Sequence, residues 1–244
     1  KGTDTTRLDP ESGVLVNNCK WTTWMEVPRD GAPIEVTALL YNFLAFIEKL
    51  QSSKTYSYKG VTLQNGEFMS FTEWKLLIEQ TFEVLYWIPK SGFSEYIVPE
   101  LVGVTGIYKD TLGSQFEEAE YQMRPNQVIA MALAPSLFNP SHAKLALKQV
   151  QNCLATEFGV KTLDSSDLQY DPSSNYNGKE CVWLYGYFLK ALANFELINK
   201  AEVLKKLQMH KDYIQNSSWE SLPDFREENS ASCLATSSLM VPLT

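Results

Sequence analysis

Apolar residues recur at helical spacing through much of the chain. In residues 33–50 and 70–88 they lie three and four positions apart, so each segment predicts a helix with a buried apolar stripe. Ser70 and Glu73 form a capping box at the start of the second helix, and Pro89 ends it. The same reasoning predicts further helices over residues 125–134, 140–154, 182–198 and 201–215.

Residues 58–71 interrupt the helical pattern. Their alternation, with Asn65-Gly66 in the middle, predicts one small β-hairpin closed by a type I′ turn. The remaining segments are long, polar and aromatic, and such loops often carry function; they cover residues 1–32, 90–124, 157–181 and 216–234. We expect a single helical domain over residues 1–244, with the loops gathered at one end.

Charge and composition narrow the function. The 21 basic and 29 acidic residues give a net charge of −8, which disfavours nucleic acid and anionic membranes as partners. No apolar run reaches transmembrane length, and the N-terminus does not resemble a signal peptide, so a reducing, cytoplasmic location is expected. The four cysteines form no C-x-x-C pair and there are only two histidines, so we expect neither a metal nor a cofactor.

Tryptophan and carboxylates are neighbours in the long loops. Residues 17–35, for example, place Trp21 and Trp24 beside Glu26 and Asp30. Aromatic faces cover the apolar face of a sugar ring, polar groups satisfy its hydroxyls, and two carboxyls supply the acid and base for glycosidic cleavage. Such neighbours also occur in helical loops that bind no sugar, and composition alone favours an unspecified helical interaction domain.

Six motifs in order carry a more specific signal. They are NNCKWTTWMEVPRDGAPIE (17–35), GIYKD (106–110), YQMRPNQVIAMALAPSLF (121–138), GVKTLDSSDLQY (159–170), WLYGYFLKA (183–191) and SSWESLPDFREEN (217–229). Together they resemble the C-terminal glucosidase region of eukaryotic glycogen debranching enzymes. The resemblance covers nearly the whole chain but only the later part of that region.

The resemblance implies an all-α fold, an (α/α)6 toroid-like helical barrel that this chain only partly contains. It implies hydrolysis of the α-1,6-linked glucose left at a glycogen branch stub, with inversion. Inverting chemistry needs two carboxyl groups about 6.5–9.5 Å apart. The implied partners are glycogen or a branched α-glucan, and the rest of the debranching enzyme or another chain covering the exposed helices.

Two carboxylates fall on the family's catalytic positions. Glu26 stands where the family has the aspartate of T-W-M-D, the general acid, and Asp224 stands where it has the glutamate of L-P-E-L, the base. Glu26 is one methylene longer than the family's aspartate, and Asp224 is one methylene shorter than the family's glutamate. Residues 175–180 also lack the family's His-Gln pair. These departures keep an alternative open, in which a diverged, non-catalytic member binds glycogen or packs against another chain.

Nine further residues are expected to line the substrate site: Trp24, Arg29, Asp30, Asp110, Arg124, Asn126, Tyr176, Glu180 and Trp183. Five of them have a structural alternative. Arg29 could instead pair with Asp30 or Glu35, and Asp110 could be a structural loop carboxylate. Asp30 and Asn126 are also placed to cap the helices that follow them, and Trp183 is equally suited to the core.

Overall fold

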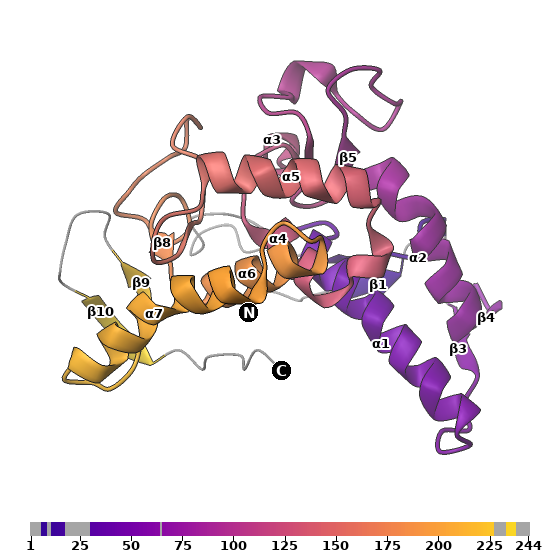
Figure 1. Cartoon of the computed structure of the whole chain (residues 1–244). Coiled ribbons are helices and arrows are strands. Elements are labelled where there is room, and N and C mark those ends of the chain that lie inside the picture. Colours follow the sequence, from indigo (N-terminus) through magenta and orange to yellow (C-terminus); the bar gives the residue numbers. More distant parts are fainter. Residues whose placement is uncertain (1–5, 9–10, 18–29, 64, 227–232, 238–244) are drawn as a thin grey trace, which may run out of the picture.

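A computed structural model describes residues 6–8, 11–17, 30–63, 65–226 and 233–237. Helices dominate it, and short strands lie before, between and after them (Figure 1). The helices are α1 (Ile34–Ser52), α2 (Phe71–Tyr86), α3 (Glu117–Glu120), α4 (Asn126–Leu133), α5 (Pro140–Cys153), α6 (Leu184–Asn194) and α7 (Lys200–Asn216). Two 3-10 turns cover Pro99–Leu101 and Pro135–Leu137.

The predicted helices are confirmed, and so is the predicted capping box. Ser70 accepts a hydrogen bond from the Glu73 amide while the Glu73 carboxylate accepts one from the Ser70 amide, which is the capping box at the start of α2. Asn139 accepts from the amides of Ser141 and His142 and begins α5, ahead of Pro140. Local sequence therefore determines where these helices begin.

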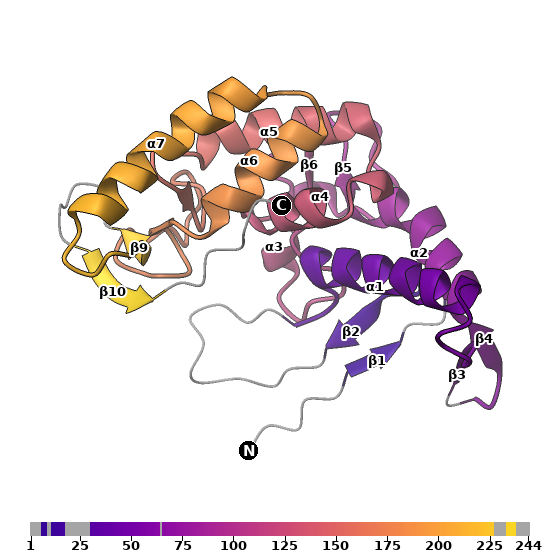
Figure 2. The same cartoon turned by 60° about the horizontal axis from the view of Figure 1, so that its bottom comes forward.

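Helix α4 lies at the centre of the fold. It is short and apolar, with Val128, Ala130 and Met131 fully buried, and it packs between α1 and α6. Helix α1 also packs against α2. Figure 2 shows α1 and α2 at one end of the molecule and α7 at the other. A helix buried on most sides reads as continuously apolar, as α4 does.

The predicted hairpin is present, but it is one of four small antiparallel sheets that the described residues form. The strands are β1 (Thr6–Leu8) with β2 (Leu15–Asn17), β3 (Gly60–Thr62) with β4 (Phe68–Ser70), β5 (Trp87–Ile88) with β6 (Ile107–Tyr108), and β7 (Val160–Lys161), β8 (Glu180–Cys181), β9 (Pro223–Arg226) and β10 (Cys233–Ser237) in one sheet. Strands of two to five residues are too short to show alternation, so sequence periodicity did not reveal the other sheets.

The β3–β4 hairpin is present, but its predicted type I′ turn is wrong. A type I′ turn here would have Asn65 and Gly66 as its two central residues, whereas Gly66, with φ +87°, is the last residue of the turn that forms. The Gly66 amide instead bonds the Leu63 carbonyl, and the Leu63 amide bonds the Glu67 carbonyl. This is the longer loop in which a left-handed glycine forms a bulge after the turn.

The apolar stripe of α1 is only partly core. Ile34, Leu44 and Ile47 are buried, but Leu39 and Phe43, which were expected inside, are about half exposed. Helix α1 carries apolar side chains on more than one of its own faces. One face packs on α2 and α4, and another faces away from them.

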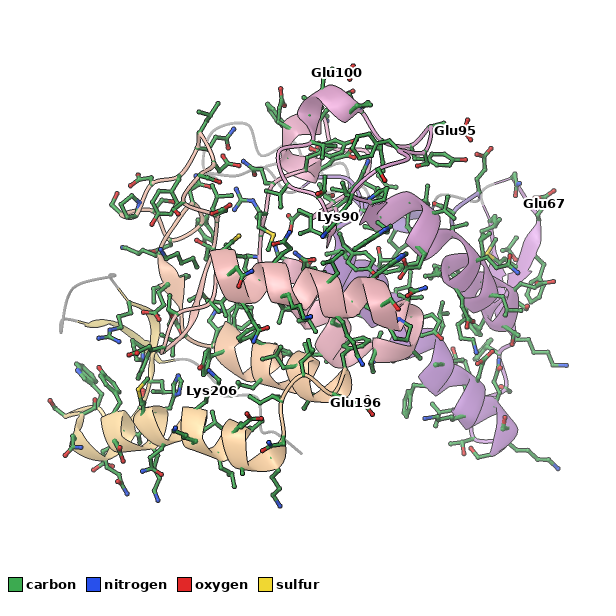
Figure 3. All side chains as sticks on the ribbon, turned by 45° about the horizontal axis from the view of Figure 1, so that its top comes forward. Glu67, Lys90, Glu95, Glu100, Glu196 and Lys206 are labelled. Carbon is green, nitrogen blue, oxygen red and sulfur yellow. The ribbon has the colours of Figure 1, made fainter. Side chains whose placement is uncertain are left out.

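Charged side chains such as Glu67, Glu95 and Glu100 lie at the outer edge of the molecule (Figure 3).

Candidate functional site

A pocket of about 510 Å³ opens between α1, α4 and the start of α6; we call it the central pocket. Its volume falls within the roughly 300–1,000 Å³ of small-molecule sites. It is lined by Glu35, Leu39, Arg124, Pro125, Asn126, Ile129, Leu133, Thr162, Asn175, Tyr176, Cys181, Trp183, Leu184, Tyr187 and Phe225. Four of the predicted substrate-binding residues are among them: Arg124, Asn126, Tyr176 and Trp183.

Asn126 is the first residue of α4. Its side-chain amide donates to Asp110 Oδ1 over 2.8 Å, and the helix begins without a side-chain cap bond from Pro125, the residue before it. Asp110 is buried behind the pocket, where its amide and carbonyl bond Glu120 and Ile34 respectively. The predicted residue Asp110 therefore lies behind Asn126 and orients its amide, rather than lining the central pocket itself.

Arg124 is 5% exposed and holds the neighbouring loop. Its guanidinium donates to the carbonyls of Thr162 and Tyr176 at 3.2 and 2.6 Å, and to Asn177 Oδ1 at 3.0 Å. Nε donates to Gln122 Oε1 at 2.9 Å. A planar guanidinium suits such a fixed set of acceptors, so Arg124 ties residues 162–177 to the start of α4.

Aromatic rings form one side of the central pocket. Trp183 precedes α6 and meets the ring of Tyr187, one turn on, edge to face at 6.0 Å. Trp183 is 38% exposed and Tyr176 is 54% exposed. Trp183 is therefore not a fully buried core residue, and its contact with substrate stays a prediction.

Strands β8 and β9 form another wall. Cys181 and Phe225 are paired across them and both line the pocket. Asp224, the expected base, is half buried beside Phe225 and does not itself line the pocket. Burial raises the pKa of the Cys181 thiol to about 12, and the negative charge of Asp224 adds to that rise. The Asp224 carboxylate is thus close enough for its charge to act on a side chain of the wall.

Two predicted residues are engaged elsewhere. Asp30 is 3% exposed, and its carboxylate accepts from Ser114 Oγ at 2.6 Å and from the Gln115 amide at 2.9 Å. Glu180 is buried and accepts from the Thr156 hydroxyl. Neither residue lines the central pocket.

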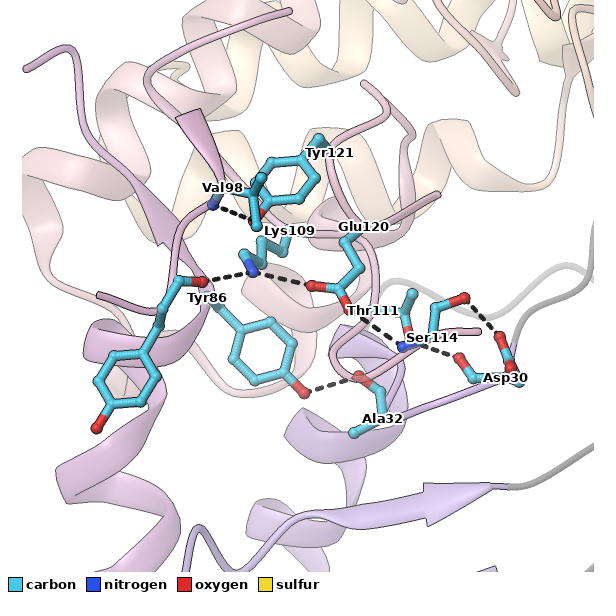
Figure 4. A network of polar contacts seen from close by, with 10 residues as sticks. Asp30, Ala32, Tyr86, Val98, Lys109, Thr111, Ser114, Glu120 and Tyr121 are labelled. Carbon is cyan, nitrogen blue, oxygen red and sulfur yellow. Dashed lines mark hydrogen bonds and ion pairs between the residues drawn. The ribbon is translucent and has the colours of Figure 1, made fainter. Parts of the chain in front are cut away.

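Asp30 belongs to a buried polar network around residues 109–121 (Figure 4). Lys109 Nζ pairs with Glu120 Oε2 at 2.9 Å and lies 4.6 Å from the centre of the Tyr121 ring. Glu120 Oε1 accepts from the Ser114 amide, and the Ser114 hydroxyl in turn reaches Asp30. The network anchors residues 30–32 against residues 110–115, directly after the segment that contains Glu26.

Comparison with known proteins decides the family. The profile of the amylo-alpha-1,6-glucosidase family matches residues 1–240. The glycogen debranching enzyme of Saccharomyces cerevisiae (strain ATCC 204508 / S288c) is 33% identical over 242 residues, covering 84% of this chain. The chain belongs to the amylo-alpha-1,6-glucosidase family. It spans 16% of the length of the yeast enzyme, so it corresponds to one part of that protein.

The site roles predicted for this glucosidase-family chain all stay predictions, and three of the residues have no described position. Trp24, Glu26 and Arg29 lie outside the described residues. Within the described residues no group of three or more metal-ligating side chains was found, and no helix there is long and apolar enough to cross a membrane.

Sequence reasoning missed one charged residue of the central pocket. Glu35, in the first turn of α1, contributes a carboxylate to the lining. In the sequence it falls in the first turn of an apolar helix and looks like an ordinary helix N-terminal acid. Its position in the RDGAPIE motif, which resembles the family pattern, was the available signal.

Proposed function

We propose that this chain forms part of a glucosidase that hydrolyses the α-1,6-linked glucose at glycogen branch stubs, with inversion. The observation that carries the proposal is the central pocket, where Glu35, Asn126, Tyr176 and Trp183 meet from separate segments of the chain. Membership of the family supports the same activity. A metal or cofactor is not part of the proposed chemistry.

The pocket lining suits one sugar ring. Trp183 and Tyr176 offer aromatic faces for the apolar side of the ring. Glu35 and Asn126 offer a carboxylate and an amide for its hydroxyls, which cannot be buried without partners. Arg124 acts mainly as a scaffold, because its guanidinium already holds residues 162–177.

The catalytic roles are proposed for Glu26 as general acid and Asp224 as general base. Asp224 is supported by its place on β9, next to Phe225 in the pocket wall. An inverting base must be ionised and must leave room for a water molecule opposite the acid, at a carboxyl separation of about 6.5–9.5 Å. Glu26 would enter from the segment that the Asp30 network anchors.

The helix arrangement supports the proposal that this chain forms half of an (α/α)6 toroid. Helices α1, α4 and α6 line the central pocket and pack on one another in sequence, whereas α2, α5 and α7 contribute no lining residue. That alternation of pocket-lining and outer helices is what three consecutive pairs of a six-pair ring would give.

The outward face of α1 supports a partner that completes the ring. Val36, Phe43 and Phe46 lie seven and three residues apart, on one side of the helix, and are 39–58% exposed. Contiguous exposed apolar side chains of this kind mark an interaction surface. We propose that the rest of a longer debranching enzyme, or another chain, covers this face.

The experiment measures free glucose released from a cyclodextrin carrying one α-1,6-linked glucose, using the intact protein that contains this chain. Glu26→Gln and Asp224→Asn are each expected to abolish release, and Glu67→Gln, an exposed hairpin carboxylate, is the control. Proton NMR of the first product should show β-glucose, as inversion requires.

A second pair of variants tests the exchanged carboxylates. Glu26→Asp and Asp224→Glu restore the family's residue types, and together they are expected to retain or raise activity. Glycogen binding without glucose release in the wild type would contradict the hydrolase proposal. The non-catalytic glycogen-binding alternative, to which the two exchanges point, would then stand.

A further inference from the structure

A second hollow, of about 730 Å³, lies at the opposite side of β9 from the central pocket; we call it the α7 hollow. It is lined by Glu157, Phe158, Met209, Asp212, Tyr213, Asn216, Ser217, Ser218, Trp219 and Arg226. These residues come from the end of α7, the turn after it, the loop before β7, and β9. Figure 2 shows α7 and β9 together at one end of the molecule.

The floor of the hollow is aromatic and well supported. Phe158 is 5% exposed, stacks on His210 at 4.3 Å and meets Tyr213 edge to face at 5.4 Å. The Arg226 guanidinium lies 5.1 Å from the centre of the same ring. His210 Nε2 is also 2.7 Å from the Phe158 carbonyl, so the ring and its backbone are both held against α7.

A tight turn presents Trp219 to solvent. The Trp219 amide donates to Ser217 Oγ at 3.2 Å, the Glu220 amide donates to the Ser217 carbonyl at 3.0 Å, and Glu220 has φ +51°. Few L-residues adopt that left-handed backbone, so the turn is specifically shaped. The turn places the indole of Trp219, which is 76% exposed, at the edge of the α7 hollow.

The lining indicates the chemistry of the ligand. Beside the exposed indole stand two carboxylates (Glu157 and Asp212), one guanidinium (Arg226), an amide and several hydroxyls. The excess of negative over positive groups disfavours phosphate and other anions. A neutral ligand with an apolar face and many hydroxyls satisfies both the indole and the polar groups, and a sugar ring has that character.

We propose that the α7 hollow is a second carbohydrate site, which holds an α-1,4-glucan chain against Trp219. The sugar class follows from the lining, and the α-glucan identity rests on the proposed function. Strand β9 separates the two sites, with Phe225 lining the central pocket and Arg226 lining the α7 hollow. A polymer held in the hollow therefore lies beside the strand that carries Asp224.

Calorimetric titration with maltoheptaose, a linear α-1,4-glucan that has no branch to cleave, tests the proposal. Trp219→Ala is expected to weaken binding about tenfold, and Trp219→Phe, which keeps an aromatic face, much less. Tyr58→Ala removes a similarly exposed ring near the β3–β4 hairpin, at the other end of the molecule, and should change nothing.

Three outcomes would overturn the proposal. These are no binding of maltoheptaose to the wild type, equal binding by wild type and Trp219→Ala, and binding that only Trp183→Ala removes, which would assign the glucan to the central pocket. The proposed hydrolase activity is measured separately by glucose release. A loss of binding in Trp219→Ala without any glucose release in the wild type would support this site while the hydrolase proposal fails.

Discussion

The Asn126 amide donates to the Asp110 carboxylate over 2.8 Å, so a residue that lines the central pocket is oriented by one buried behind it. Neighbouring backbone bonds hold Asp110 in place: its carbonyl accepts from Ile34 at the start of α1. The pocket's polar group is thus tied to α1 as well as to α4.

Replacing Asp110 with alanine removes the acceptor for Asn126. Asn126 is half buried, and a hydrogen bond of this kind contributes about 0.5–1.5 kcal/mol, so we expect the free energy of unfolding to fall by that amount. Asp110→Asn keeps one carbonyl oxygen and should lose less. Denaturant titration of the two variants measures the difference, and equal stability of Asp110→Ala and wild type would contradict this role.

Gly31 is expected to tolerate no side chain. It has φ +80°, and a Cβ there would lie 2.2 Å from the Leu112 carbonyl oxygen. We expect Gly31→Ala to lower the free energy of unfolding by about 3 kcal/mol or more, because both steric overlap and left-handed strain oppose it.

Gly66 provides the matched control for Gly31. It has φ +87°, but a Cβ at this position would have no atom within 4 Å, so Gly66→Ala meets only the backbone strain. That strain costs about 1–2 kcal/mol. If thermal unfolding shows the same loss in both variants, the contact with Leu112 does not matter.

Arg124→Lys is expected to release residues 162–177. Lysine cannot reproduce the planar set of donors that reaches Thr162, Tyr176 and Asn177. Hydrogen bonds from a charged group are worth about 1.5–3 kcal/mol, so the stability loss should be of that size. Hydrogen exchange should rise in residues 162–177 and stay unchanged in α2; unchanged exchange in the loop would rule out the scaffold role.

His210 is expected to make stability depend on pH. Burial lowers its pKa below the ordinary value of 6.5, although the Phe158 carbonyl opposes the shift. The unfolded chain then binds more protons than the folded one, so the contribution to stability is complete above 6.5 and is lost as the pH falls towards the lowered folded pKa.

A substitution at His210 isolates this effect from the titration of carboxylates. Denaturant titrations of wild type and His210→Gln from about pH 7.5 down to about pH 5.5 measure the two slopes. The wild type should lose more stability over that range than His210→Gln does. If the stability of wild type and of His210→Gln falls equally with pH, His210 binds protons equally in the folded and unfolded states.

Local signals predicted the helices well and some of their ends poorly. A few adjacent residues determine the capping box at Ser70 and the start of α5 at Asn139-Pro140. Helix α6 instead stops at Asn194, earlier than expected, because Glu196 takes φ +58° and the Leu197 amide returns to the Leu192 carbonyl. Glycine usually marks such an end, and a glutamate there gives no warning.

The site was predictable in its residue types and less so in their roles. Arg124, Asn126, Tyr176 and Trp183 were expected and do line one pocket. Asp30 looked equally suited to bind a sugar, and only tertiary contacts with Ser114 and Gln115 show that its carboxylate is already engaged. Glu35 was overlooked because an acid in the first turn of a helix looks the same whether it lines a pocket or faces water, although it lies in a motif that resembles the family pattern.

The outward side of α1 has a practical consequence for handling the polypeptide. Phe43 is 58% and Phe46 54% exposed, on a helix whose other side is packed. Two phenyl rings left in water favour self-association. A preparation of these 244 residues alone should therefore aggregate as its concentration rises, and mild detergent should suppress that aggregation.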